Sequence, residues 1–77
     1  MARQFQDENF LVWEVYPSGS RFGLSESPYL VFHCLTDRQL APRFLEHGEH
    51  EADAERSVVE ASPADLLALL RRSRETG

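Results

Sequence analysis

The sequence predicts an α+β fold, in which a small antiparallel meander of three or four strands packs against one C-terminal helix. Two segments, residues 10–16 and 29–35, are dense in the β-branched and aromatic residues that favour strands. The connections between the extended segments are short, which favours antiparallel pairing over parallel crossovers. Residues 62–74 combine the start and stop signals of an amphipathic helix.

Length and composition favour a single small domain over residues 1–77. The hydrophobic content of 42% and the charged content of 27% are ordinary for a globular chain. We divide the domain into a strand-rich part (2–42), an acidic loop (43–61) and a C-terminal helix (62–74). A chain this short buries little surface, so its stability is expected to be marginal.

The first strong strand, residues 10–16, is predicted to end at Pro17, which lacks the N–H that a strand ladder needs. Residues 3–6 alternate weakly between apolar and polar side chains. Asp7, Glu8 and Asn9 then supply the turn chemistry expected of a hairpin. The two segments are therefore interpreted as paired antiparallel strands.

The second strong strand, residues 29–35, is followed by turn-type residues 36–39. A short return strand is predicted over residues 39–41, because Pro42 follows directly. Together with the hairpin, this gives the meander.

The C-terminal helix has the clearest local signal. Ser62 is suited to the N-cap, Pro63 to the first helical position and Asp65 to the third. Leucines spaced three and four residues apart form one apolar face. Arginines crowd the last turn, where they complement the negative end of the helix dipole.

The acidic loop concentrates the charge of the chain. Residues 46–60 hold six acids and one arginine, a balance of −5 that equals the formal charge of the whole chain. Such a run is typical of a solvated loop, here with one or two helical turns and a short extended segment before residue 62. The functional interpretation is an acidic surface for a basic partner.

Both faces of the two strong strands are largely apolar, and this is the main functional clue. Period-two alternation places Trp13 and Phe32 on one face, with Cys34 beside them. One helix can cover that face but not the other. The opposite face is therefore predicted to bind a partner through six residues: Phe10, Val12, Tyr16, Tyr29, Val31 and Leu35. The alternative is that the acidic loop and residues 22–24 fold over it.

We therefore expect a non-enzymatic protein–protein interaction module that uses an apolar sheet face or edge. The partner is another protein or a second copy of this chain, because soluble monomers rarely leave large apolar patches uncovered. Small domains without disulfides often gain stability by association.

A metal-binding or metal-stabilised domain is the alternative function. His47 and His50 have the two-residue spacing of metal ligands, and His33 or Cys34 would add a third ligand. His33 and Cys34 are neighbours on a strand and point to opposite faces, so only one of them joins the site. No other cofactor is expected.

Other classes are disfavoured by the sequence. The net charge of −5 argues against nucleic-acid binding. The longest apolar runs are far below a membrane span, and no signal-peptide pattern follows Met1. With a single cysteine, a cytoplasmic location is expected. No enzyme is expected, because Cys34 is predicted to be buried and no paired carboxylates or phosphate loop stand out.

Overall fold

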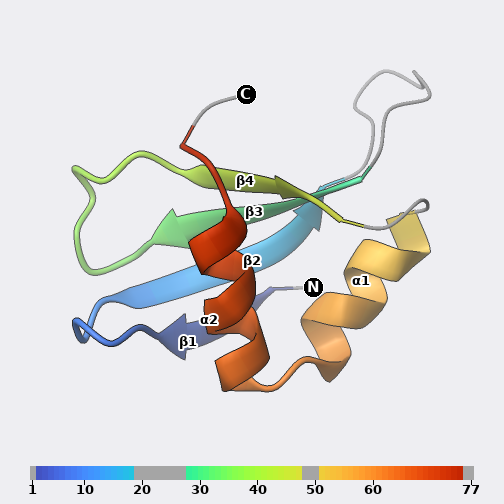
Figure 1. Cartoon of the computed structure of the whole chain (residues 1–77). Helices are drawn as coiled ribbons and strands as arrows, with labels where there is room; N and C mark the ends of the chain where they lie inside the picture. Colours follow the sequence, from blue (N-terminus) through green and yellow to red (C-terminus); the bar gives the residue numbers. More distant parts are fainter. Residues whose placement is uncertain (1, 19–27, 48–50, 76–77) are drawn as a thin grey trace.

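The computed structural model describes residues 2–18, 28–47 and 51–75, which form a four-stranded antiparallel sheet in the order β1-β2-β3-β4 and two helices (Figure 1). The elements are β1 (Arg3–Gln6), β2 (Val12–Ser18), β3 (Tyr29–Cys34), β4 (Arg43–Glu46), α1 (Glu51–Glu60) and α2 (Pro63–Arg72). The predicted α+β class and antiparallel meander are confirmed.

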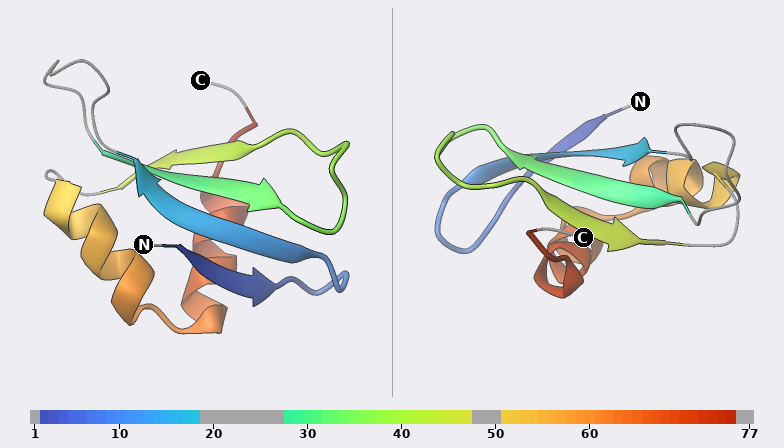
Figure 2. Two further views of the ribbon diagram at one scale, coloured as in Figure 1. Left: turned by 180° about the vertical axis from the view of Figure 1, so that it is seen from behind. Right: turned by 90° about the horizontal axis from the view of Figure 1, so that it is seen from above.

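Both helices lie on the same side of the sheet. Ala54 and Val58 of α1 and Leu66 and Leu70 of α2 all pack into one core with the same sheet face. Seen from behind, α2 passes behind the strands and α1 lies beside them (Figure 2). We call the helix-covered side the closed face and the other side the open face.

The core lies between the closed face and the helices. The buried closed-face residues are Phe5, Trp13, Val15, Leu30, Phe32 and Cys34. From the helices, Ala54, Val58, Leu66 and Leu70 pack against them. The predicted inner face of the strong strands is therefore confirmed. The rings of Phe5 and Phe32 meet edge to face with centroids 6.2 Å apart, an arrangement that aromatic pairs prefer.

The prediction of an acidic loop over residues 43–61 is wrong, and so is the prediction of one helix. This stretch contains β4 and α1. In α1, Ala54 and Val58 are four residues apart and fully buried, so a narrow apolar stripe is enough to anchor the helix. The acidic side chains Glu55 and Glu60 are exposed beside it.

The return strand begins later than predicted. Residues 39–41 belong to the connection, and β4 starts at Arg43, after Pro42. Asp37 organises this turn: its carbonyl accepts from the Leu40 N–H at 3.2 Å and its carboxylate accepts from the Gln39 N–H at 3.0 Å. Side-chain bonds of this kind compete with strand pairing, which explains the shift.

Pro17 does not end β2, contrary to the prediction. It pairs with Leu30 inside the strand. The Leu35 N–H donates to the Val12 carbonyl, so the backbone N–H and C=O groups of Val12 point towards β3. Because this direction alternates along a strand, the backbone groups of residues 14, 16 and 18 also point towards β3. Pro17 therefore faces the β1 side, where the pairing has already ended at Arg3↔Val15. The missing N–H costs no ladder bond there.

Side-chain hydrogen bonds fix the end of α1 and the start of α2. Arg3 of β1 donates to the carbonyls of Val58, Val59 and Ala61 at 3.0, 3.2 and 2.7 Å. It supplies the cation that the last turn of α1 lacks. Ser62 caps α2 in a capping box with Asp65, which confirms the predicted start of this helix. Within the described residues, neither helix has the length and apolar content needed to cross a membrane.

Candidate binding site on the open face of the sheet

The open face of β2, β3 and β4 carries three rows of side chains, fixed by the strand register. The central row is Tyr16, Val31 and Phe44. One neighbouring row is Ser18, Tyr29 and Glu46. The other pairs Glu14 with His33, and Pro42 follows on the β4 side. Directly opposite residues in antiparallel strands point to the same face, so these nine residues form one surface. We call it the open-face grid.

The centre of the grid is hollow because a small side chain lies between two large ones. Val31 is only 7% exposed, although no described helix covers it, while Tyr16 and Phe44 on either side are 38% and 36% exposed. The two rings form walls and the valine forms the floor. The hollow encloses about 510 Å³ and is lined by Tyr16, Ser18, Tyr29, Val31, His33, Pro42 and Phe44.

The backbone pairing sets the width of this hollow. Tyr16 and Val31 form a hydrogen-bonded pair of the antiparallel ladder, and the Cα atoms of such a pair are about 5.5 Å apart. Val31↔Phe44 is a pair without mutual backbone bonds, with Cα atoms about 4.5 Å apart, because the backbone of Phe44 bonds elsewhere. The two walls therefore start about 10 Å apart, which leaves room for one inserted side chain or one extended segment.

Phe44 is held in place by the C-terminal end of the described chain. Its N–H donates to the Arg74 carbonyl at 2.6 Å, and the Arg74 N–H donates back at 2.9 Å. Next to it, Arg43 donates from Nε to the Ser73 hydroxyl at 2.8 Å and also binds the Ser73 carbonyl. These contacts cover part of the outer edge of β4 and fix the position of one wall.

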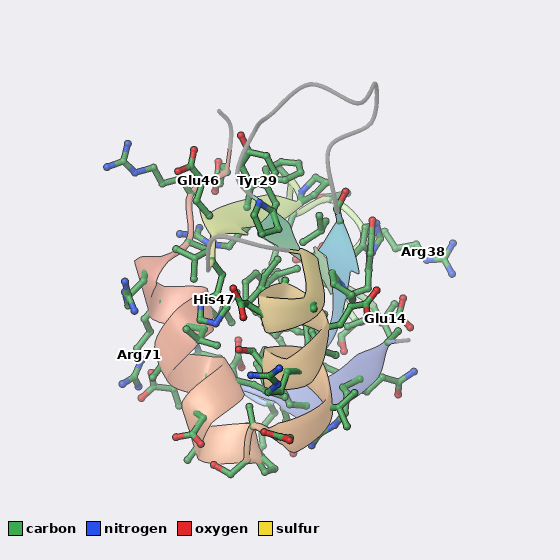
Figure 3. All side chains as sticks on the ribbon, turned by 90° about the vertical axis from the view of Figure 1, so that its right-hand side faces the viewer. Glu14, Tyr29, Arg38, Glu46, His47 and Arg71 are labelled. Atoms are coloured by element: carbon green, nitrogen blue, oxygen red, sulfur yellow. The ribbon has the colours of Figure 1, made fainter. Side chains whose placement is uncertain are left out.

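The polar groups of the grid are available to a ligand. Figure 3 shows Glu14 and Arg38 on the side of the sheet away from the helices, and Glu46 beside Tyr29. Among the described residues, the carboxylates of Glu14 and Glu46 make no ion pair. Glu14 and Glu46 occupy opposite corners of the grid, with the aromatic hollow between them.

Three of the six residues predicted to bind a partner, Tyr16, Tyr29 and Val31, meet in the hollow. Val12 is half-buried at the β1 side of the same face, opposite Gln6. Leu35 is 38% exposed and lies one residue beyond the end of β3, where its N–H still donates to the Val12 carbonyl at 2.8 Å. Residues 22–24, the alternative cover, lie outside the described residues.

Phe10 is also misplaced by the prediction, because it belongs to the β1–β2 turn and not to β2. Its φ angle of 65° is in the left-handed region, and its side chain is 76% exposed. The Phe10 N–H donates to the Asp7 carbonyl at 3.1 Å, and the Asp7 N–H donates to the Leu11 carbonyl at 2.9 Å. A turn followed by a left-handed residue is a common three-residue hairpin loop.

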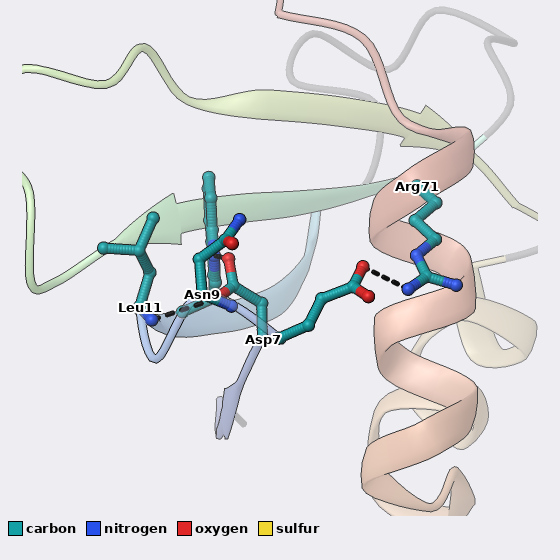
Figure 4. A network of polar contacts seen from close by, with 6 residues as sticks. Asp7, Asn9, Leu11 and Arg71 are labelled. Atoms are coloured by element: carbon teal, nitrogen blue, oxygen red, sulfur yellow. Dashed lines mark hydrogen bonds and ion pairs between the residues drawn. The ribbon is translucent and has the colours of Figure 1, made fainter.

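Asp7 holds this turn together (Figure 4). One carboxylate oxygen accepts from the N–H groups of Asn9 and Leu11 at 2.8 and 2.9 Å, and the other accepts from the Trp13 indole at 2.9 Å. Burial raises the pKa of Asp7, but these hydrogen bonds stabilise the carboxylate more, so the pKa lies below its ordinary value of 3.8. The same figure shows the exposed ion pair between Glu8 and Arg71.

Sequence reasoning missed Phe44 and Pro42 as parts of the site. The alternation of Phe44 and Glu46 with Arg43 and Leu45 is the signal that could have found β4. This alternation covers only four residues next to an acidic stretch. The charges there favour the interpretation as a loop over that as a strand. His33, predicted as a metal ligand, also lines the hollow.

The candidate metal ligands are spread over the molecule. His33 is exposed on the open face, while Cys34 is buried on the closed face and accepts from the Asp37 N–H at 3.3 Å. His47 bonds through Nε2 to the Ser57 hydroxyl at 2.6 Å, joining β4 to α1. His50 lies outside the described residues. Within the described ranges, no three His, Cys, Asp or Glu side chains are grouped to hold a metal ion.

Comparisons with known protein families, with curated proteins and with solved structures find no match for this chain.

Proposed function

We propose that this chain is a non-enzymatic protein-interaction module that binds its partner on the open face of the sheet. The single observation that carries the proposal is the aromatic hollow over Val31. An exposed apolar patch with polar residues at its rim is typical of an interaction site. Aromatic residues supply much of the energy of protein interfaces.

A second groove, between the helices, supports the proposal less well. It encloses about 480 Å³, close to the volume of the open-face hollow. Its lining includes Arg56, Glu60, Asp65 and Arg72, charges of both signs that are typical of a solvated helix surface. It contains no aromatic side chain.

The partner in this proposal is a protein and not a nucleic acid or a membrane, and the site of action is the cytoplasm. The grid offers aromatic rings and carboxylates, whereas phosphate backbones are bound mainly by basic side chains. The one cysteine, Cys34, is a buried free thiol, which suits a reducing compartment.

The test is site-specific photocrosslinking in cells that express the full chain. The photoreactive residue p-benzoylphenylalanine replaces Phe44 in the hollow, or Ala68 on α2 as a matched control. Ala68 is exposed on the helix side. We expect crosslinked protein from position 44 and little from position 68. The mass of the product then shows whether the partner is another protein or a second copy of the chain.

Equal crosslinking from both positions, or none from position 44, would contradict the proposal. Circular dichroism on both labelled proteins verifies that the substitution leaves the fold intact. Phe44 is on the edge strand and 36% exposed, so an aromatic replacement of larger size is tolerated there.

A further inference from the structure

The open-face grid has a charge pattern as well as a shape. Glu14 of β2 and Glu46 of β4 occupy opposite corners, and the apolar centre lies between them. Across the strands the corners are about 10 Å apart, and along the strands four residues add about 14 Å. The diagonal is therefore about 17 Å, the reach of five extended residues.

The shape of the grid disfavours a second copy of the chain as its occupant. In a two-fold dimer whose axis passes through the hollow, the hollow faces itself and leaves a void. The carboxylates would also approach an equally acidic chain, and the net charge of −5 opposes self-association. A convex ligand of opposite charge avoids both penalties.

We infer that the open-face grid binds an extended basic segment of a partner protein, with an apolar or basic side chain inserted over Val31. This inference rests on the proposed function and names the chemistry of the partner. Arginine or lysine residues about five positions apart reach Glu14 and Glu46, and the rings of Tyr16 and Phe44 contact the central side chain. A cation placed over these rings is attracted to their faces.

The two helices carry charges of both signs: arginines at positions 56, 71 and 72 lie among the acidic residues Asp53, Glu55, Glu60 and Asp65. On the grid, the charged members Glu14 and Glu46 are both acidic. Arg38, in the β3–β4 connection, extends on the same side as Glu14 (Figure 3). A basic ligand is therefore expected to bind more tightly to Arg38→Ala than to the unchanged chain, because one repulsive charge is removed.

The experiment is a selection of random twelve-residue peptides on the immobilised full chain at low salt. The peptides recovered are measured by fluorescence anisotropy against three variants that have passed a circular dichroism test of folding. Glu14→Gln/Glu46→Gln removes the two corner charges, and Tyr16→Thr/Phe44→Thr removes the walls. Glu55→Gln/Glu60→Gln removes two exposed charges from α1 and serves as the matched control.

We expect the recovered peptides to carry two basic residues four to six positions apart. Their affinity should fall about fivefold to tenfold with Glu14→Gln/Glu46→Gln, at least as much with Tyr16→Thr/Phe44→Thr, and less than about twofold with the α1 control. Raising the salt concentration should weaken binding to the unchanged chain and have less effect on the corner variant.

The failures are distinguishable. Peptides without a basic excess, or peptides indifferent to the corner charges but lost with the wall variant, overturn the inference and leave the proposed function standing. A dimer in gel filtration with light scattering that Tyr16→Thr/Phe44→Thr abolishes would also overturn the inference and leave the proposed function standing. No recovered peptide, or peptides indifferent to both variants, would overturn the inference and contradict the proposed function.

Discussion

The two faces of the sheet use similar side chains in different surroundings. On the closed face, Trp13, Val15 and Phe32 are buried beneath the helices. On the open face, Tyr16 and Phe44 remain more than a third exposed. Burial removes apolar surface from water and stabilises the fold, whereas an exposed ring contributes little to folding and can still contribute to binding. An apolar residue in one of these strands can therefore serve folding or binding, depending on the face on which it lies. Substitutions on the two faces can distinguish these roles.

The largest effect is expected on the closed face, at Trp13. Its indole ring is 5% exposed and its N–H donates to Asp7 at 2.9 Å. Trp13→Ala leaves a cavity and an unpaired acceptor, which together should cost about 3–5 kcal/mol. That is close to the whole stability of a small domain, so circular dichroism should show a largely unfolded chain. A loss below about 1 kcal/mol in urea titrations would show that this face is not the main core.

The junction between the sheet and the helix layer should be the next most sensitive region. Arg3 donates to three carbonyls at the end of α1. Arg3→Met keeps most of the aliphatic stem and removes the charged donors, which should cost about 1.5–3 kcal/mol. Arg71→Met is the control, because its ion pair with Glu8 is exposed and contributes at most about 1 kcal/mol. Equal losses in urea titrations would show that Arg3 does not anchor α1.

The contribution of α2 to stability is tested at its N-cap residue, Ser62. Ser62 accepts from the Asp65 N–H at 3.1 Å. Ser62→Ala should cost about 0.5–2 kcal/mol, and in a chain of this size that lowers the melting temperature by several degrees. Ser62→Asp supplies another capping acceptor and should restore most of the stability. If neither change moves the melting temperature, the start of α2 contributes nothing to the cover of the closed face.

Local signals in the sequence were sufficient for α2 and for the faces of the strong strands. Ser62 and Pro63 define a helix start within two residues, and alternation alone assigns Trp13 and Phe32 to one face. β4 and α1 depend on contacts between distant residues. Arg3 anchors α1 from the other end of the chain, and the Arg74 backbone pairs with Phe44.

The candidate site was predicted in part, for the same reason. Tyr16, Tyr29 and Val31 follow from period-two alternation of two strong strands. The hollow needs a third strand to supply its second wall, Phe44. Because β4 is short and lies in an acidic stretch, its alternation was too weak to identify from the sequence.

The turn below Trp13 makes the closed face sensitive to acid. The pKa of Asp7 is below its ordinary value of 3.8, so folding favours the carboxylate. Its contribution to stability is present above that value and is lost as the pH falls through the lower pKa of the folded state. The free energy of unfolding of the unchanged chain should exceed that of Asp7→Asn at pH 6, and the difference should shrink below about pH 4. A difference that is constant between pH 6 and pH 2 would contradict this role.

The smallest effect on stability is expected on the open face, at Tyr16. Its ring is 38% exposed, and threonine keeps the strand preference of the position. Tyr16→Thr weakens the cross-strand pair with Val31 and should cost less than about 1 kcal/mol in urea titrations, while circular dichroism stays unchanged. If Tyr16→Thr unfolds the chain as Trp13→Ala does, the ring is needed for folding. The open face is then a second core surface, and the apolar hollow on which the interaction module rests is already filled by the chain itself.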